Sequence, residues 1–192
     1  MTAEQRPEIP QGFTWKDCTG INARFPMPET WFFKQEASPT TLGYFLTREP
    51  IAGESFYVGV GGITLKTTKP EGFFKTGLSV NTIPHFDRIT RHRPSRFGKL
   101  FIGNPRTALI PTSRATEERN GKLMTFRRFF RSNPLKVMGQ RLEPTHYYVE
   151  FTANDSTGAA YIIMFETPSR MWKEDQQTAR TMIEKRILDP EF

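Results

Sequence analysis

Cysteine is almost absent from this 192-residue sequence, in which Cys18 is the single example. One thiol excludes an internal disulfide framework and any metal cluster that needs several cysteines. Long apolar runs are missing as well, and no stretch approaches the roughly 20 residues of a membrane-spanning helix. The first residues lack the apolar core of a signal peptide. The compartment stays open, because a removed targeting segment would imply an organelle lumen or export, and otherwise the protein would be cytoplasmic.

Acidic residues are scarce in one part of the chain, although 20 are present overall against 27 Lys and Arg. Residues 88–131 hold 12 basic residues and two acidic ones, Glu117 and Glu118, within a chain of net charge +7. Such a basic segment attracts nucleic acid, an anionic membrane surface or an acidic protein. It also suits a solvated strand that lysine and arginine protect against edge pairing.

Aromatic residues, in contrast, are abundant, with 17 Phe and an aromatic share of 13%. Disordered chains are poor in aromatics, and this length suits one domain. We therefore expect a single domain over residues 12–192. Residues 1–11 are polar, include Pro7 and Pro10, and are predicted to form a flexible arm.

Alternating apolar and polar residues predict several strands in the first third of the chain. The extended runs cover residues 12–16, 21–25, 31–34, 44–49 and 56–65. Pro26 and Pro28 are expected to end the second run, and Pro50 the fourth. The spacing then changes after Pro70 and predicts a helix near residues 70–80.

Two hairpins are predicted from local turn signals. Asn120-Gly121 is the preferred pair for a type I′ turn, because both central residues need a positive φ. It predicts a hairpin whose second strand covers residues 122–131. A turn at residues 154–158 is predicted to join a strand over 146–153 to one over 159–166.

The chain ends with an amphipathic segment that predicts a long helix over residues 169–187. Ser169 is expected to cap its free backbone amides, and Glu174 and Asp175 are expected to lie in solvent. The apolar face should pack on the sheet and comprises Trp172, Ala179, Met182, Ile183 and Ile187. Hairpins with a terminal helix predict an α+β fold, in which a mostly antiparallel twisted sheet is flanked by helices.

The order of these elements resembles the PsbP-like superfamily. The landmarks are Gly12-Phe13, a strand running into Pro28-Glu29-Thr30-Trp31, a helix opening at residues 69–71, the strand 161–165, and Glu166 to Trp172 before the terminal helix. This superfamily includes PsbP, the extrinsic lumenal protein of photosystem II, the Mog-type Ran-binding proteins and DcrB-type lipoproteins. The resemblance covers most of the chain and implies a central antiparallel sheet flanked by helices.

The same resemblance implies an accessory subunit rather than an enzyme. No functional residue of the family maps onto a matching motif here, so none is transferred. The basic segment 88–131 is not a hallmark of the family, and its members are often exported. A START-type helix-grip domain is the alternative fold, which would enclose an apolar ligand cavity. The early order of three strands and a helix fits it less well.

Residues that could carry out chemistry are few. His85, Asp87 and His92 could in principle place metal ligands on one loop, but short histidine spacings are often accidental and we expect no metal there. Cys18 is expected in a turn, as a lone thiol without a role, and His146 at the surface or on a sheet face. No catalytic residue and no cofactor are predicted.

An arginine–aromatic run occupies the strand of the first hairpin. Alternation places Phe126, Arg128 and Phe130 on one face, and Arg127, Phe129 and Arg131 on the other. Single-strand nucleic-acid binders use such mixed faces. Strand phenylalanines are core residues far more often than stacking platforms, so the run favours a core face carrying the outer phenylalanines, with Arg128 near its rim and Arg127 and Arg131 in solvent.

We predict a non-enzymatic binding or assembly subunit of PsbP-like type. Its basic hairpin surface would dock onto an acidic protein or multiprotein complex, since complementary charge speeds encounter and selects the partner. The predicted contact residues are all arginines, namely Arg91, Arg93, Arg96, Arg127, Arg128 and Arg131. One alternative is a nucleic-acid-binding protein that uses the same surface. Another is a small-ligand carrier or enzyme with a cavity between the sheet and the terminal helix. Peripheral membrane association also stays open.

Overall fold

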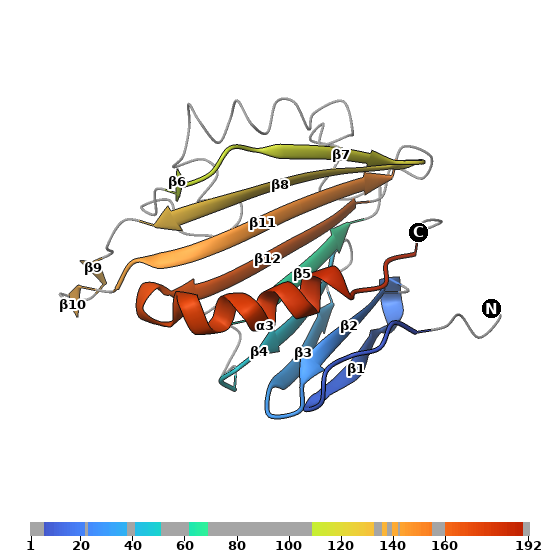
Figure 1. Ribbon diagram of the computed structural model, residues 1–192, viewed down its shortest axis with the longest axis horizontal. Helices are drawn as coiled ribbons and strands as arrows, with labels where there is room; N and C mark the ends of the chain where they lie inside the picture. The colour runs from blue at the N-terminus through green and yellow to red at the C-terminus, as the bar shows by residue number, and fades with distance from the viewer. Residues whose placement is uncertain are drawn as a thin grey trace.

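The computed structural model describes residues 6–21, 23–37, 41–50, 62–68, 109–132, 136–137, 140–141, 143–154 and 160–189. Its main feature is a twisted eight-stranded sheet with the order β3-β4-β5-β12-β11-β8-β6, in which β7 also pairs with β8 (Figure 1). Every pairing in this sheet is antiparallel. The strands are β3 (Phe32–Ala37), β4 (Thr41–Thr47), β5 (Gly62–Thr68), β6 (Leu109–Pro111), β7 (Thr116–Asn120), β8 (Leu123–Ser132), β11 (Thr145–Asn154) and β12 (Ala160–Pro168).

Two small antiparallel hairpins accompany the large sheet. β1 (Phe13–Cys18) pairs with β2 (Ala23–Pro28) across the 3-10 turn η1 (Thr19–Ile21), and β9 (Lys136–Val137) pairs with β10 (Gln140–Arg141). Together with the terminal helix described below, this arrangement confirms the predicted α+β class. The helix expected near residues 70–80, and residues 56–61 of the fifth expected strand, lie outside the described residues.

Both predicted hairpins are present. β11 and β12 pair from Thr145 opposite Pro168 to Ala153 opposite Ala160, with Tyr148 opposite Phe165. The turn between β7 and β8 lies one position later than expected, because Asn120 pairs with Leu123 and leaves Gly121 and Lys122 as the central residues. Gly121 has a φ of +57°, which glycine adopts without steric cost.

The prediction that Pro26 and Pro28 end the second strand is wrong, since β2 runs to Pro28. The reason is the side to which their nitrogen atoms point. Arg24 donates its N–H to Ile187 O at 2.8 Å, on the side of β2 away from β1. Nitrogen atoms alternate along a strand, so those of Pro26 and Pro28 face the same outer side, and the β1–β2 ladder loses no donor.

Helix α3 (Trp172–Glu184) follows β12 after the short 3-10 turn η4 (Ser169–Met171) and is shorter than the predicted 169–187. The expected cap is also different. Ser169 Oγ is buried without a hydrogen-bond partner, whereas Glu143 Oε1 accepts the Arg170 amide N–H at 2.5 Å. A carboxylate from the segment before β11 therefore takes the role assigned to Ser169, and its charge suits a helix start. No helix of the described chain is long and apolar enough to cross a membrane.

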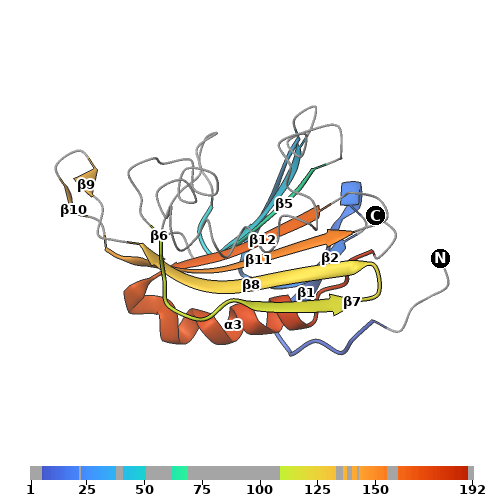
Figure 2. The ribbon, with the colours of Figure 1, turned by 90° about the horizontal axis from the view of Figure 1, so that it is seen from above.

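The principal core lies between one face of the large sheet and a layer made of α3 and the β1–β2 hairpin (Figure 2). The helix contributes Ala179, Met182 and Ile183, as predicted, and they pack with buried sheet residues such as Tyr161 and Ile163. Trp172 is only half-buried, and Ile187 lies beyond the helix in a bridge to Arg24. The opposite sheet face holds a second set of buried side chains: Phe126, Phe130, Tyr147, Val149 and Phe151.

The expected turn position of Cys18 is wrong. The residue ends β1 and is fully buried in the principal core. Burial raises the pKa of its thiol to about 12, and the neighbouring Asp17 carboxylate adds to this effect. Cys18 is therefore a small apolar core residue and not a nucleophile at neutral pH.

A candidate binding groove between the terminal helix and the sheet

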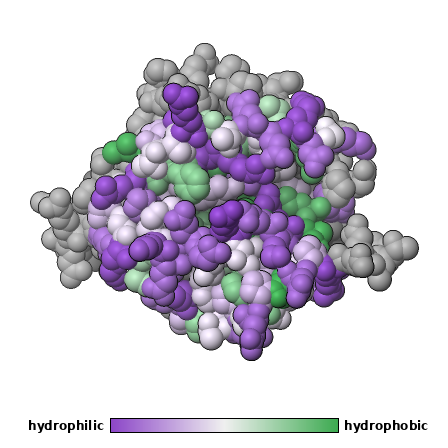
Figure 3. Space-filling view, in the orientation of Figure 1, coloured by the Kyte–Doolittle hydropathy of each residue, from purple (hydrophilic) through white to green (hydrophobic). Residues whose placement is uncertain are grey.

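A half-open pocket of about 740 Å³ lies between α3 and the uncovered part of the large sheet, and we call it the α3 groove. α3 packs on β12 and β2, so the helix-side faces of β11 and β8 form the floor beside it. In the space-filling view, pale green side chains reach the surface in the band between α3 and these strands (Figure 3). The alternative hypothesis of a ligand carrier placed a cavity in this position.

One end of the groove is aromatic. Strand pairing puts Phe129 opposite Tyr148, and their ring centroids are 5.1 Å apart. Trp172, the first residue of α3, meets Phe129 edge-on at 5.9 Å, and His146 stacks on Trp172 at 4.8 Å. Phe129 and Trp172 are half-buried, so part of their ring surface faces solvent at this end.

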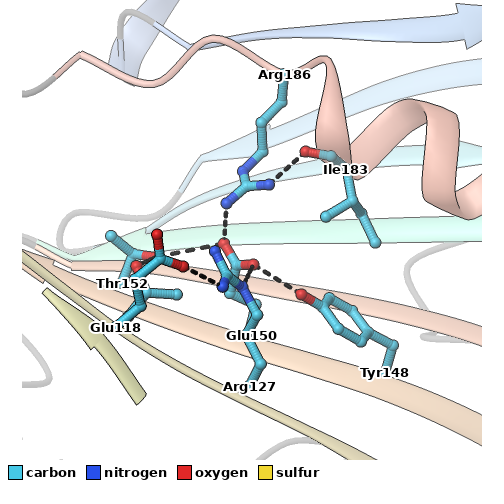
Figure 4. A network of polar contacts seen from close by, with 8 residues as sticks. Glu118, Arg127, Tyr148, Glu150, Thr152, Ile183 and Arg186 are labelled. Atoms are coloured by element: carbon cyan, nitrogen blue, oxygen red, sulfur yellow. Dashed lines mark hydrogen bonds and ion pairs between the residues drawn. The ribbon is translucent and has the colours of Figure 1, made fainter. Parts of the chain in front are cut away.

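The other end is charged and is organised around Glu150, a fully buried residue of β11 (Figure 4). Arg127 on β8 donates its Nε to Glu150 Oε2 at 2.9 Å, and Tyr148 OH donates to the same oxygen at 2.7 Å. Glu150 Oε1 accepts from Arg186 Nη2 and from Thr152 Oγ1 at 3.3 Å. Each carboxylate oxygen therefore accepts two hydrogen bonds.

The two arginines extend these contacts to neighbouring elements. Arg127 Nη1 forms an ion pair with Glu118 of β7 at 2.5 Å, and Arg186 Nη1 donates to Ile183 O near the end of α3. We call Glu118, Arg127, Glu150 and Arg186 the Glu150 cluster. It joins β7, β8, β11 and the chain just after α3, with two charges of each sign.

The pKa values of the cluster residues have clear physical causes. Burial works to lower the pKa of Arg127, but hydrogen bonds to Glu150 and Glu118 outweigh it and raise that pKa. Burial, followed by the Glu150 charge, raises the pKa of Tyr148. The hydrogen bond and charge of Arg127 lower the pKa of Glu118. These three groups keep their usual protonation near neutral pH, so they act as fixed charges and donors rather than as a proton relay.

A second buried acid ties the start of α3 to the sheet. Asp175 is 4% exposed, accepts a hydrogen bond from Thr167 Oγ1, and forms an ion pair with Arg48 at 2.8 Å. The expectation that Glu174 and Asp175 both lie in solvent is therefore wrong for Asp175, while Glu174 is exposed. A carboxylate in the first helical turn also interacts favourably with the helix dipole.

The predicted alternation of the arginine–aromatic run agrees with the strand register. Arg127, Phe129 and Arg131 pair opposite Glu150, Tyr148 and His146 on the groove side. Arg128 lies on the other face, is 6% exposed, and donates its Nε to Ser113 O at 3.2 Å. Its guanidinium is thus part of the interior, which argues against a direct contact with a partner.

The other predicted contact arginines differ in accessibility. Arg127 belongs to the Glu150 cluster and is partly exposed, whereas Arg131 is exposed on the groove side, two residues beyond Phe129. The remaining three, Arg91, Arg93 and Arg96, lie outside the described residues. The structure therefore brings Arg127 and Arg131 to one sheet face and separates Arg128 from them.

Sequence reasoning missed Glu150 and Arg186, which hold the charged end together. Glu150 stands among the aromatic and apolar residues Tyr147 to Phe151, and an acid at the centre of such a run needs a cation opposite it. That signal was available, but the opposing residue could be identified only once β8 was known to pair with β11.

The candidate metal ligands His85, Asp87 and His92 lie outside the described residues. Elsewhere, within the part of the chain that the structure describes, no group of three or more His, Cys, Asp and Glu side chains could hold a metal ion. His146 is engaged with Trp172, and burial, followed by the charge of Arg131, lowers its pKa.

No protein-family model and no curated protein match this sequence. Solved structures match it in shape. The solution structure of cyanobacterial PsbP (CyanoP) from Synechocystis aligns with a TM-score of 0.53 over 93% of each chain, at 10% identity. The Ran-binding protein Mog1p of Saccharomyces cerevisiae aligns with a TM-score of 0.47 over 92% of this chain and 95% of that one, at 11% identity. The chain is thus similar in fold to CyanoP, as the sequence landmarks predicted, and at this identity the likeness concerns the fold alone.

Proposed function

We propose that this chain, which shares its fold with CyanoP, is a non-enzymatic binding subunit that docks onto a protein partner through the aromatic end of the α3 groove and Arg131. A fold of this type supports the proposal only in general terms, because one fold serves many functions. The specific support comes from the groove.

The observation that carries the proposal is the position of Trp172 beside Phe129. Their ring centroids are 5.9 Å apart, and both residues are half-buried and line the pocket. Arg131 is exposed on the same sheet face. Trp and Arg are enriched among the residues that dominate binding energy at protein interfaces, where they fill or border pockets.

The charged end supports a binding role rather than a chemical one. Glu150 accepts four hydrogen bonds, so its oxygens have no capacity left to take a proton from a substrate. Arg180 and Glu184, which line the groove from α3, also pair with each other at 2.8 Å. The charged side chains here hold the groove in shape.

The proposal keeps the acidic partner that the sequence predicts. Only two of the predicted contact arginines that the structure describes remain part of it. Arg131 would meet a partner carboxylate, and Arg127 would contribute through the part of its guanidinium that faces solvent. Arg91, Arg93 and Arg96 stay proposed members of the docking surface. Complementary charge would mainly raise the association rate.

A capture experiment from the native source tests this proposal. The immobilised wild-type chain is compared with Arg131→Glu and with Arg114→Glu, which makes the same charge change at an exposed residue between β6 and β7. We expect Arg131→Glu to lose partner proteins that Arg114→Glu retains, with capture unaffected by nuclease. Equal capture by both variants would refute the docking surface. Loss of capture after nuclease treatment would instead show that the surface binds nucleic acid.

A further inference from the structure

We infer that the α3 groove holds a small-ligand site for an aromatic ring that carries a carboxylate, with the ring at the aromatic end and the carboxylate near Arg127 and Arg180. This inference goes beyond the proposed function, because it requires no protein partner. It rests on the size of the pocket, its walls and its hydrogen-bonding groups.

The size and walls of the pocket suit a ring. Its volume of about 740 Å³ falls within the range of roughly 300–1,000 Å³ that is typical of small-molecule sites. Phe129, Tyr148 and Trp172 supply aromatic walls, and Ile183 and Leu188 supply aliphatic ones. Aromatic walls of this kind favour a flat ring, because offset or edge-to-face contacts add to the burial of apolar surface.

The hydrogen-bonding groups of the groove favour an acceptor on that ring. Arg127 on β8 and Arg180 on α3 line opposite walls. A guanidinium has five N–H donors; Arg127 uses its Nε and Nη1 toward acids of the Glu150 cluster, and Arg180 uses its Nε toward Glu184. The Nη2 of Arg127 and both Nη atoms of Arg180 are not used in these contacts, and Glu150, the buried acceptor beside Arg127, already accepts four hydrogen bonds. Glu184 is the carboxylate among the lining residues and already pairs with Arg180, so the remaining guanidinium nitrogen atoms can take an acceptor from a ligand, and a planar carboxylate matches their geometry.

The charges around the pocket set the expected strength. Glu118, Glu150 and Glu184 offset Arg127, Arg180 and Arg186, so a carboxylate would gain directional hydrogen bonds rather than a large net attraction. Most of the affinity should come from the ring, and most of the selectivity from the two guanidinium groups.

Titration of the full chain with two probes that share one ring tests the inference. Indole-3-acetate carries the carboxylate, and tryptamine carries an ammonium group instead. Binding is followed by NMR shifts of the Trp172 indole N–H and of the Ile183 and Leu188 methyl groups. We expect saturable shifts with indole-3-acetate and a Kd at least roughly tenfold higher for tryptamine. Equal affinity, or no saturable shift with indole-3-acetate, would overturn the inference.

Two pairs of variants locate the site. Gln176→Trp fills the pocket from an exposed helix position, whereas Gln177→Trp adds the same side chain at a neighbouring exposed position outside it. Arg180→Met removes a guanidinium from the wall, whereas Arg170→Met removes one that is paired with Glu143 elsewhere. Only the first member of each pair should weaken indole-3-acetate binding. Weakening by neither, or equally by both members, would show that the probe binds in another place.

The carboxylate could belong to a free molecule or to the carboxyl terminus of a protein. Mass spectrometry of small molecules released from the native protein on denaturation would detect the first. A tripeptide ending in Trp that binds more tightly than indole-3-acetate, and loses binding when amidated, would indicate the second. If the probe does not bind while Arg131→Glu still abolishes partner capture, this inference is refuted and the proposed function stands.

Discussion

Arg127 and Glu150 face each other across strands β8 and β11, and the Nε of Arg127 lies 2.9 Å from Oε2 of Glu150. Glu150 has no exposed surface, while a third of the Arg127 side chain reaches solvent. The pair therefore links the interior of the sheet to the floor of the α3 groove. A buried carboxylate is tolerated at this position because its oxygens are all hydrogen-bonded and two cations offset its charge.

Replacing Glu150 with Gln should destabilise the fold strongly. Glu150→Gln keeps the side-chain size but leaves Arg127 and Arg186 without their shared buried counter-charge. We expect a loss of about 3 kcal/mol in the free energy of unfolding, measured by urea denaturation. Glu184→Gln, which breaks the exposed pair with Arg180, is the control and should change stability little. Similar stabilities for both variants would show that the cluster does not hold the sheet together.

Asp175 should contribute more to the stability of the fold than an acidic residue in a helical turn usually does. Asp175→Asn removes the charge that pairs with Arg48 and weakens the hydrogen bond from Thr167. We expect a loss of about 1–3 kcal/mol in the free energy of unfolding. Glu174→Gln, at the adjacent exposed position, serves as the matched control. Equal effects of the two changes would contradict the buried role of Asp175.

Local signals in the sequence were sufficient for much of the fold. Turn signals at Asn120-Gly121 and at residues 154–158 identified both hairpins, and a period of two residues identified the two faces of residues 126–131. The apolar spacing after Pro168 identified the terminal helix and its buried residues Ala179, Met182 and Ile183. These features depend on neighbours along the chain, which the sequence displays directly.

The parts that were missed depend on contacts between distant residues. Asp175 is polar and falls on a helix, and only the position of Thr167 and Arg48 explains its burial. Pro26 extends a strand because its nitrogen faces the outer edge of β2. The candidate groove exists because α3 covers β12 but not β8. The sequence of the helix does not indicate which strands it covers.

Cys18 should resist thiol reagents in the folded protein. Its thiol is fully buried, and its pKa is raised to about 12 by burial and then by Asp17, so almost no thiolate is present near neutral pH. We expect no reaction with an aromatic disulfide reagent in buffer at neutral pH and complete reaction in denaturing urea. Rapid labelling without denaturant would mean that the β1–β2 hairpin opens readily from the core.

His146 should make stability depend on pH. Burial and the charge of Arg131 lower its pKa in the folded state below the ordinary value of 6.5. The unfolded chain then binds more protons than the folded one as the pH falls through 6.5. The free energy of unfolding should therefore decrease on acidification through this window and recover above it. Urea denaturation at a series of pH values measures this dependence.

The contribution of His146 is isolated by comparison with His146→Phe, which keeps an aromatic ring against Trp172 but cannot take up a proton. The variant should lose the part of the pH dependence that lies around and below 6.5, while carboxylates that titrate at lower pH affect both proteins alike. Arg131→Gln should reduce the same part without removing it, because the charge of Arg131 is the second cause of the shift and burial is the first. Identical pH profiles for the wild type and His146→Phe would show that His146 titrates equally in the folded and unfolded chains. In that case the aromatic end of the groove would be open enough for the imidazole to be fully solvated.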